Sequence, residues 1–178
     1  MCPNPWTGWA GYQDDSADNE ERQTQAIEQG KLYPYLEMVN VYHCPASEKI
    51  EIRCYSIPDP LGNPDTEGAS YMGDAKPVIK TTQVKASSSR IVFLDEGYAT
   101  FGGYTIYYDR PEWWDWPPIR HDNGVTLGFV DGHSEFYKWR DERTIEAGEG
   151  ETGINHDGNE DLMMMQRGIY GKLGYLPN

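Results

Sequence analysis

The dipeptide Asp131-Gly132, set between two strand-like segments, constrains the fold of this chain more than any other feature. Residues 124–130 (GVTLGFV) and 134–139 (SEFYKW) are rich in β-branched and aromatic side chains, which favour strands. Asp-Gly readily adopts the positive φ angles of tight hairpin turns. The segment from Gly124 to Trp139 is therefore predicted to be a β-hairpin, which commits the protein to an antiparallel sheet.

Two further segments carry strand patterns. Residues 90–95 (RIVFLD) are almost continuously apolar, which is typical of a central strand, and residues 78–85 alternate between apolar and polar side chains. Proline and glycine are dense between residues 55 and 77, and this composition predicts loops. We therefore expect an antiparallel sheet interrupted by long irregular loops.

Helical patterns lie toward the two ends of the chain. Residues 18–29 are predicted to form a surface helix, because Asp18 is placed as an N-cap and Gly30 as a stop. Near the C-terminus, Asp157 or Asn159 is expected to cap a short helix. The fold class is thus predicted to be α+β, with an N-terminal surface helix.

Length and charge limit what the chain can be. At 178 residues it fits a single domain, with an aromatic arm at residues 1–17 and an acidic extension at residues 141–178. The 29 acidic residues outnumber the 15 basic ones, and the net charge of -14 would repel a phosphate backbone. Because of this charge, the chain is not expected to bind nucleic acid. No run of 18 apolar residues occurs, so it is not expected to span a membrane either.

The three cysteines are Cys2, Cys44 and Cys54. Nine residues separate Cys44 from Cys54, and this spacing suits a disulfide that closes a small loop. Such a bond would stabilise the fold by about 2–3 kcal/mol, and an aromatic-rich chain with cysteines in loops suits an oxidising compartment. Two reduced cysteines in apolar surroundings are the alternative, and the pairing of Cys2 stays open.

A pattern at residues 120–133 (RHDNGVTLGFVDGH) places nine residues between His121 and Asp131-Gly132. It closely resembles the His-x9-Asp-Gly signature of the prepilin-type processing-associated proteins. Other pieces resemble the same family in the same order: residues 32–36 (LYPYL), 43–47 (HCPAS), 70–73 (SYMG) and 88–95 (SSRIVFLD). Together they cover residues 32–140.

This family is similar to the pseudopilins of type II secretion, in which a hydrophobic N-terminal helix packs into a filament and an antiparallel sheet faces outward. The resemblance implies a pseudopilin-like globular domain that is a structural or assembly subunit of a bacterial envelope or extracellular filament. Its partners would be copies of itself or other pseudopilin-like subunits, in the periplasm or outside the cell. The apolar helix and cleavage site of the family are absent here, so the resemblance concerns the globular part.

His121, Asp131, Gly132 and His133 are expected to form a structural motif. In it, the ring of His121 hydrogen-bonds to the hairpin turn and braces the loop that enters the strand. The alternative is a metal site made of His121, Asp131 and His133, whose side chains are all acceptable ligands of zinc or iron.

A second candidate site is the acidic loop that contains Asp157, Asn159 and Asp161. These residues present oxygen atoms at alternate positions, as a calcium loop does. Pseudopilins of the major type bind calcium in a C-terminal loop, so the resemblance makes calcium a candidate cofactor. The alternative is a plain helix cap.

Trp113, Trp114 and Trp116 form a third candidate site, in a segment that is rich in tyrosine. The rings suit three roles, which are packing into a small core, contact with a protein partner, and stacking against a sugar.

The chain is not expected to be an enzyme, because it contains no G-x-S-x-G, no phosphate loop and no H-E-x-x-H. Besides the structural subunit, two functions stay open. One is a calcium-assisted or carbohydrate-binding module on the cell surface. The other is a metal-dependent hydrolase that uses His121 and Asp131.

Overall fold

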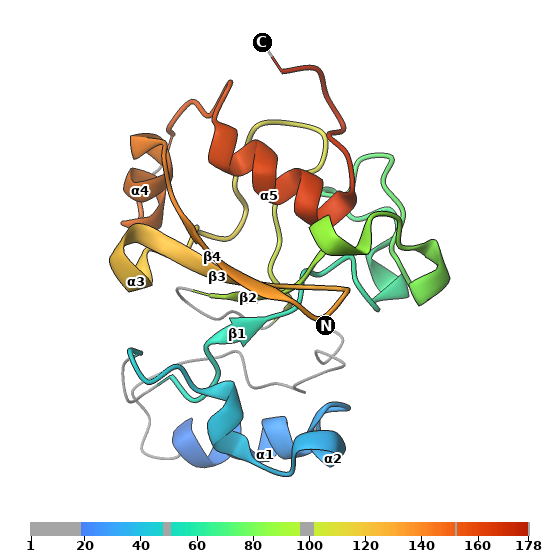
Figure 1. Cartoon of the computed structure of the whole chain (residues 1–178), viewed down its shortest axis with the longest axis vertical. Coiled ribbons are helices and arrows are strands. Elements are labelled where there is room, and N and C mark those ends of the chain that lie inside the picture. The colour runs from blue at the N-terminus through green and yellow to red at the C-terminus, as the bar shows by residue number, and fades with distance from the viewer. Residues whose placement is uncertain (1–18, 48–50, 97–101, 152, 178) are drawn as a thin grey trace.

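The computed structural model describes residues 19–47, 51–96, 102–151 and 153–177. The larger, upper part of the molecule contains the sheet with the helix of residues 160–170 above it, and the lower part contains the helices of residues 19–28 and 33–36 (Figure 1). The helices are α1 (Asn19–Glu28), α2 (Tyr33–Leu36), α3 (Arg120–Asn123), α4 (Glu142–Gly148) and α5 (Glu160–Tyr170). Short 3-10 turns are η1 (Val39–Tyr42), η2 (Pro64–Thr66), η3 (Thr81–Gln83) and η4 (Ser87–Ser89).

The four strands form one antiparallel sheet in the order β1-β2-β3-β4. They are β1 (Tyr55–Ser56), β2 (Ile91–Asp95), β3 (Gly124–Phe129) and β4 (Ser134–Lys138). The predicted hairpin is confirmed, since β3 pairs with β4 around Asp131-Gly132, where Gly132 has a φ of 93°. The predicted central strand is also confirmed, because β2 is paired on both sides. The α+β class with an antiparallel sheet is therefore correct.

The strand predicted for residues 78–85 is wrong. Val78 makes one isolated bridge to Leu61, and the chain then turns through η3. The side chain of Gln83 accepts hydrogen bonds from the backbone N–H groups of Ile79 and Lys80, at 2.9 and 2.8 Å. This local bonding closes the turn and competes with pairing to a neighbouring strand.

The larger of two hydrophobic cores lies between the sheet and α5. Leu94 and Leu127 from the sheet meet Leu162, Met165 and Ile169 from the helix, and all five are at most 1 % exposed. The helix approaches β2 so closely that a Cβ placed on Gly168 would lie 2.3 Å from Cδ1 of Ile91. Residues 160–170 are thus an integral part of this core, whereas we expected residues 141–178 to form an extension.

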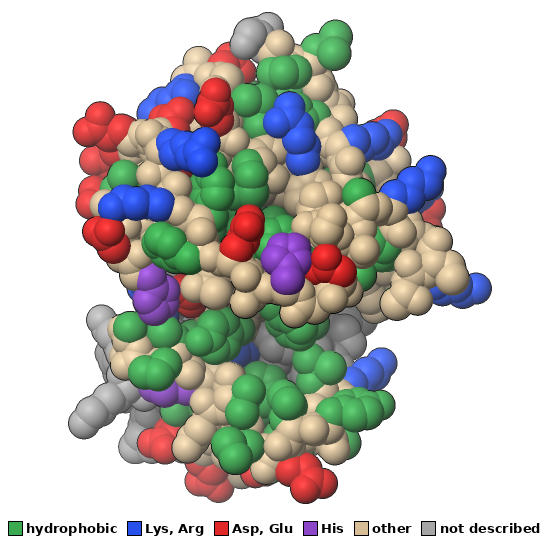
Figure 2. Space-filling model, in the orientation of Figure 1, with side chains coloured by type: hydrophobic (Ala, Val, Ile, Leu, Met, Phe, Trp, Pro, Cys, Tyr) green, Lys and Arg blue, Asp and Glu red, His purple; other side chains and the backbone are tan. Residues whose placement is uncertain are grey.

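The smaller core lies in the lower part of the molecule. Ala26 and Ile27 of α1 pack against Tyr42 of η1, with Leu32, Tyr33, Val39, Ile52 and Ile57 around them. The segment expected as a surface helix contains α1, whose buried residues face this core. On the outside, Tyr35, Leu36, Met38 and Val41 are exposed, and hydrophobic side chains gather on this lower part of the surface (Figure 2).

Several sequence predictions lie outside the described residues, namely the aromatic arm at residues 1–17, the N-cap role of Asp18 and the pairing of Cys2. Within the described ranges, no helix is both long enough and apolar enough to cross a bilayer.

Candidate metal centre

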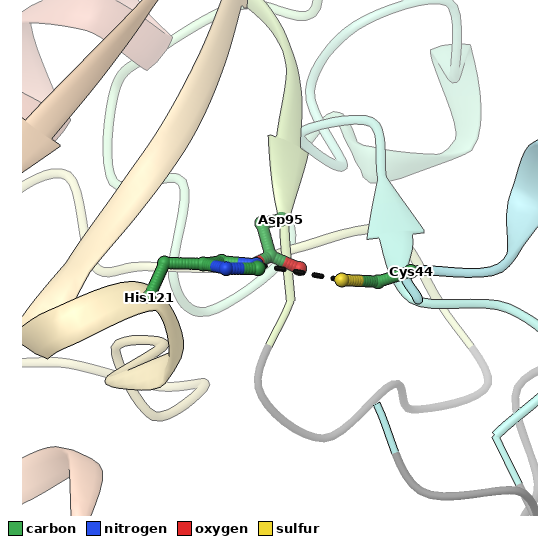
Figure 3. Close-up of side chains that lie close together, drawn as sticks. All are labelled: Cys44, Asp95 and His121. Atoms are coloured by element: carbon green, nitrogen blue, oxygen red, sulfur yellow. Dashed lines mark hydrogen bonds and ion pairs between the residues drawn. The ribbon is translucent and has the colours of Figure 1, made fainter. Parts of the chain in front are cut away.

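Three side chains that are distant in the sequence meet where the two cores join. They are Cys44, Asp95 and His121, and one potential ligand atom from each lies within 4.8 Å of the others. Sγ of Cys44 is 3.4 Å from Nε2 of His121, and Oδ2 of Asp95 is 3.1 Å from the same nitrogen. Figure 3 shows the three side chains pointing toward one another.

Each of the three is placed by a different local structure. Cys44 follows η1, and the backbone N–H of Ala46 points at its sulfur at 3.4 Å. Asp95 is the last residue of β2. His121 lies in α3, immediately before β3. The small core therefore contributes the sulfur, and the sheet contributes the nitrogen and the oxygen.

The turn that carries His121 has an unusual backbone. His121, Asp122 and Asn123 have consecutive φ angles of 59°, 62° and 56°, so α3 is a left-handed turn. This conformation costs most L-residues about 1–2 kcal/mol each. Histidine, aspartate and asparagine are the side chains that enter it most readily, which explains why the local sequence His-Asp-Asn can form it.

The Asp95 carboxylate is in a poor environment for an anion. Its side chain is fully buried, and among the described residues none donates a hydrogen bond to Oδ1. Burial raises the pKa of the Asp95 carboxyl, and the charges of His121 and Arg120 oppose this only in part. Nearby, burial followed by the charges of Cys44 and Asp95 raises the pKa of Tyr55 to about 12. Burial thus disfavours the negatively charged form of both groups.

Other charged residues surround the three side chains. Arg120 forms an ion pair with Glu51, and Arg53 forms one with Glu96 at 3.3 Å. Arg53 also donates to Ser56 Oγ at 2.6 Å, and that hydroxyl donates to Glu96. We call this largely buried polar layer the junction; it consists of Cys44, Glu51, Arg53, Ser56, Asp95, Glu96, Arg120 and His121.

The arrangement of the three side chains differs from that of a nucleophile, base and orienting acid. In such a relay, the nucleophile and the acid contact opposite nitrogens of the imidazole ring. Here Cys44 and Asp95 both face Nε2 of His121. Three ligand types that converge on one point are instead the arrangement that a metal ion requires.

The predicted bracing of the hairpin by His121 is wrong. His121 precedes β3 and Asp131 follows it, and the six residues of β3 separate them by roughly 20 Å at about 3.3 Å per residue. The alternative metal site of His121, Asp131 and His133 is excluded by the same separation. Asp131 and His133 do contact each other, with Oδ1 2.5 Å from Nδ1, and the His133 ring stacks on Phe129.

The predicted disulfide between Cys44 and Cys54 is not formed in the structure, where both thiols are free. The two sulfurs have different neighbours. Cys44 faces His121, whereas Sγ of Cys54 points at the carbonyl oxygen of Glu51 at 3.6 Å.

The predicted calcium loop is a helix cap instead. Asn159 is the N-cap of α5, and its Oδ1 accepts from the backbone N–H of Leu162 at 3.0 Å. Asp161 accepts hydrogen bonds from the Tyr137 hydroxyl and from two backbone N–H groups, those of residues 140 and 141. Because these oxygens are already used, they do not form a ligand set with Asp157.

The three predicted tryptophans divide into two groups. Trp113 is 9 % exposed and belongs to the larger core, whereas Trp114 and Trp116 are about half exposed. Both exposed rings line an open groove of about 510 Å³, together with Asn155 and His156.

Sequence reasoning identified Cys44 and His121 but gave each a different partner, and it did not single out Asp95 as a site residue. The available signal was the set of resembling segments, because residues 43–47, 88–95 and 120–133 each contain one of the three side chains.

No family model matches the sequence, and neither a curated protein nor a solved structure is significantly similar to this chain.

Proposed function

We propose that this protein is a structural or assembly subunit, pseudopilin-like, of a bacterial envelope or extracellular filament. In this proposal it acts in the periplasm or outside the cell and associates with copies of itself or with related subunits. The observation that carries the proposal is the convergence of three motif segments, residues 43–47, 88–95 and 120–133, at the junction. Segments that resemble one family in sequence thus also meet as one structural unit.

The geometry of the junction favours a structural role over a catalytic one. Cys44 and Asp95 share a single nitrogen of His121, so no proton relay runs from a nucleophile through the ring to an acid. The ion pairs Arg120–Glu51 and Arg53–Glu96 connect the same two parts of the molecule. Buried polar contacts of this kind set the relative position of packed parts.

An apolar surface on the lower part supports self-association. Tyr35 is 85 % exposed, Met38 55 % and Val41 48 %. Contiguous exposed apolar side chains are typical of interaction surfaces.

The test is the assembly state of the purified chain, measured by negative-stain microscopy and light scattering. We expect regular oligomers or filaments, and Met38→Glu should reduce them. Phe136→Glu is the matched control, since Phe136 is 52 % exposed but lies on β4 in the upper part. A protein that stays monomeric at all concentrations, or that responds equally to both substitutions, would contradict the proposal.

A second candidate function, carbohydrate binding, is favoured by the groove beside Trp114 and Trp116. Half-exposed indole rings next to Asn155 offer both a stacking surface and a polar group for a sugar. A glycan array followed by tryptophan-fluorescence titration tests it. Binding that disappears in Trp116→Ala and persists in Phe136→Ala would support this function, and an array without hits would eliminate it.

A further inference from the structure

We infer that Cys44, Asp95 and His121 bind a divalent transition-metal ion of the zinc class, which clamps the small core to the sheet. The inference deepens the proposed function, because it rests on the structural role of the junction and names the ligand of that site. The clamp joins one part to the other directly, since the sulfur comes from the loop after η1 while the oxygen and nitrogen come from the ends of β2 and α3.

The distances between the ligand atoms fit such an ion. In a tetrahedral zinc site, sulfur and nitrogen ligands lie about 3.6 Å apart, and nitrogen and oxygen ligands about 3.4 Å apart. Here the corresponding separations are 3.4 Å and 3.1 Å. Two of the three separations are thus close to those of a zinc site, and the sulfur and a carboxylate oxygen of Asp95 lie within 4.8 Å of each other.

The charges at the site also fit a dication. Cys44 and Asp95 are both buried, at 2 % and 0 % exposed, and a thiolate and a carboxylate this close together repel each other strongly. When the ion binds, the Cys44 thiol releases its proton to solvent, and a sulfur–metal bond replaces the sulfur–hydrogen bond. Two negative ligands then balance the two positive charges.

The carboxylate of Asp95 provides an independent indication of a ligand. A buried carboxylate that lacks hydrogen bonds destabilises the fold, because the water it has lost is not replaced by other partners. Oδ1 receives no hydrogen bond from any described residue, and Oδ2 is turned toward His121 and Cys44. A metal ion at this point would reduce the cost by coordinating that oxygen.

The chemistry of the three ligands selects the class of ion. Calcium and magnesium prefer sites made almost entirely of oxygen, and this site offers one carboxylate. A thiolate with an imidazole favours zinc and related transition metals. The side chain of His121 is 31 % exposed, so solvent reaches this ligand, and a water molecule would complete the coordination.

The experiment uses the full chain, freed of metal with a chelator and kept reduced. Cobalt(II) is added as the spectroscopic probe, because a thiolate ligand produces a near-ultraviolet charge-transfer band that oxygen and nitrogen ligands do not. We expect the band to saturate at one cobalt per chain and to disappear when zinc is added. Zinc should also raise the melting temperature, as any ligand of the folded state does.

Variants identify the ligands. Cys44→Ser should abolish the band, and Asp95→Asn and His121→Gln should each weaken cobalt affinity by about tenfold or more. Cys54→Ser and Cys2→Ser are the controls for the other thiols. The double variant Asp131→Asn/His133→Gln is the control for an exposed Asp–His pair, and it should leave the affinity unchanged.

The outcomes separate this inference from the proposed function. A band that persists in Cys44→Ser, the absence of stoichiometric uptake, or peptide mapping that finds Cys44 bonded to Cys54 would each overturn the metal site. None of these results changes the assembly state seen by microscopy. If a ligand variant does not fold, the difference in melting temperature of the unaltered chain between zinc and chelator still decides the matter.

Discussion

The larger core is buried and the junction is largely buried, but they are built from opposite chemistry. The larger core is made of aliphatic and aromatic side chains between α5 and the sheet. The junction contains two arginines and three carboxylates, of which Arg53, Asp95 and Glu96 are at most 1 % exposed. Apolar contacts tolerate small shifts between elements, whereas ion pairs and ligand atoms require particular positions. We therefore expect the core to supply stability and the junction to fix how the two parts of the molecule meet.

The largest expected effect concerns pH and Asp115, at the edge of the junction. Burial, and then the charge of Glu96, raises the pKa of Asp115 from 3.8 to about 8, and Asp59 and Arg53 also face it. At pH values between 3.8 and about 8, Asp115 keeps its proton in the folded protein but has released it in the unfolded chain. The free energy of unfolding therefore falls as the pH rises, by up to about 1.4 kcal/mol per pH unit.

Asp115→Asn should flatten this dependence, while Asp74→Asn, which changes an exposed carboxylate, should leave it intact. Urea denaturation at intervals between about pH 5 and pH 8 measures the slope. Equal slopes for Asp115→Asn and the unaltered protein would show that Asp115 titrates normally.

The next effect is the loss of the ion pair in the junction. Arg53→Met removes the guanidinium that pairs with the buried Glu96 carboxylate, and should lower the free energy of unfolding by about 3–5 kcal/mol. Replacing Glu96 by Gln in the same protein should restore part of the loss. Lys76→Met is the control, since its pair with Glu67 is exposed and is worth about 0–1 kcal/mol. Similar losses for Arg53→Met and Lys76→Met would remove the distinction between the buried and the exposed pair.

A third prediction compares the two cores directly. Leu127→Ala and Ile27→Ala each remove a fully buried side chain, and each should lower the free energy of unfolding of its own core by about 2–5 kcal/mol. We expect Leu127→Ala to reduce hydrogen-exchange protection throughout the sheet. Ile27→Ala should reduce it in α1, α2 and η1 while β3 and α5 stay protected, because the two cores are joined by polar contacts. Loss of protection in β3 from Ile27→Ala would mean that the molecule unfolds as one unit.

The smallest effect concerns the N-cap of α5, the helix that packs on the larger core. Asn159→Ala should lower the free energy of unfolding by about 0.5–2 kcal/mol, since the helix loses its N-cap and Thr144 loses a partner. Asp157→Ala should change it by less than about 0.5 kcal/mol, because Asp157 is exposed. Thermal denaturation distinguishes the two, and a larger effect from Asp157 would reopen its role as a ligand.

The fold was predictable where local sequence and tertiary packing agree. The Asp131-Gly132 turn, the apolar run at residues 90–95 and the cap at Asn159 all have local causes, and all are present in the structure. The strand at residues 78–85 failed because Gln83 offers the backbone a local alternative. The candidate site was only partly predictable, since its three side chains lie 51 and 26 positions apart along the chain (95 − 44 and 121 − 95).

By itself, the sequence determined the antiparallel hairpin, the α+β class and the acidic surface, because turn chemistry, side-chain alternation and net charge act over short distances or over the whole composition. Only the tertiary structure decided that Cys44 faces His121 and not Cys54, and that Asp95 completes the set. Which groups share a buried space depends on how strand ends and loops are brought together by packing, and the spacing of residues along the chain does not encode that.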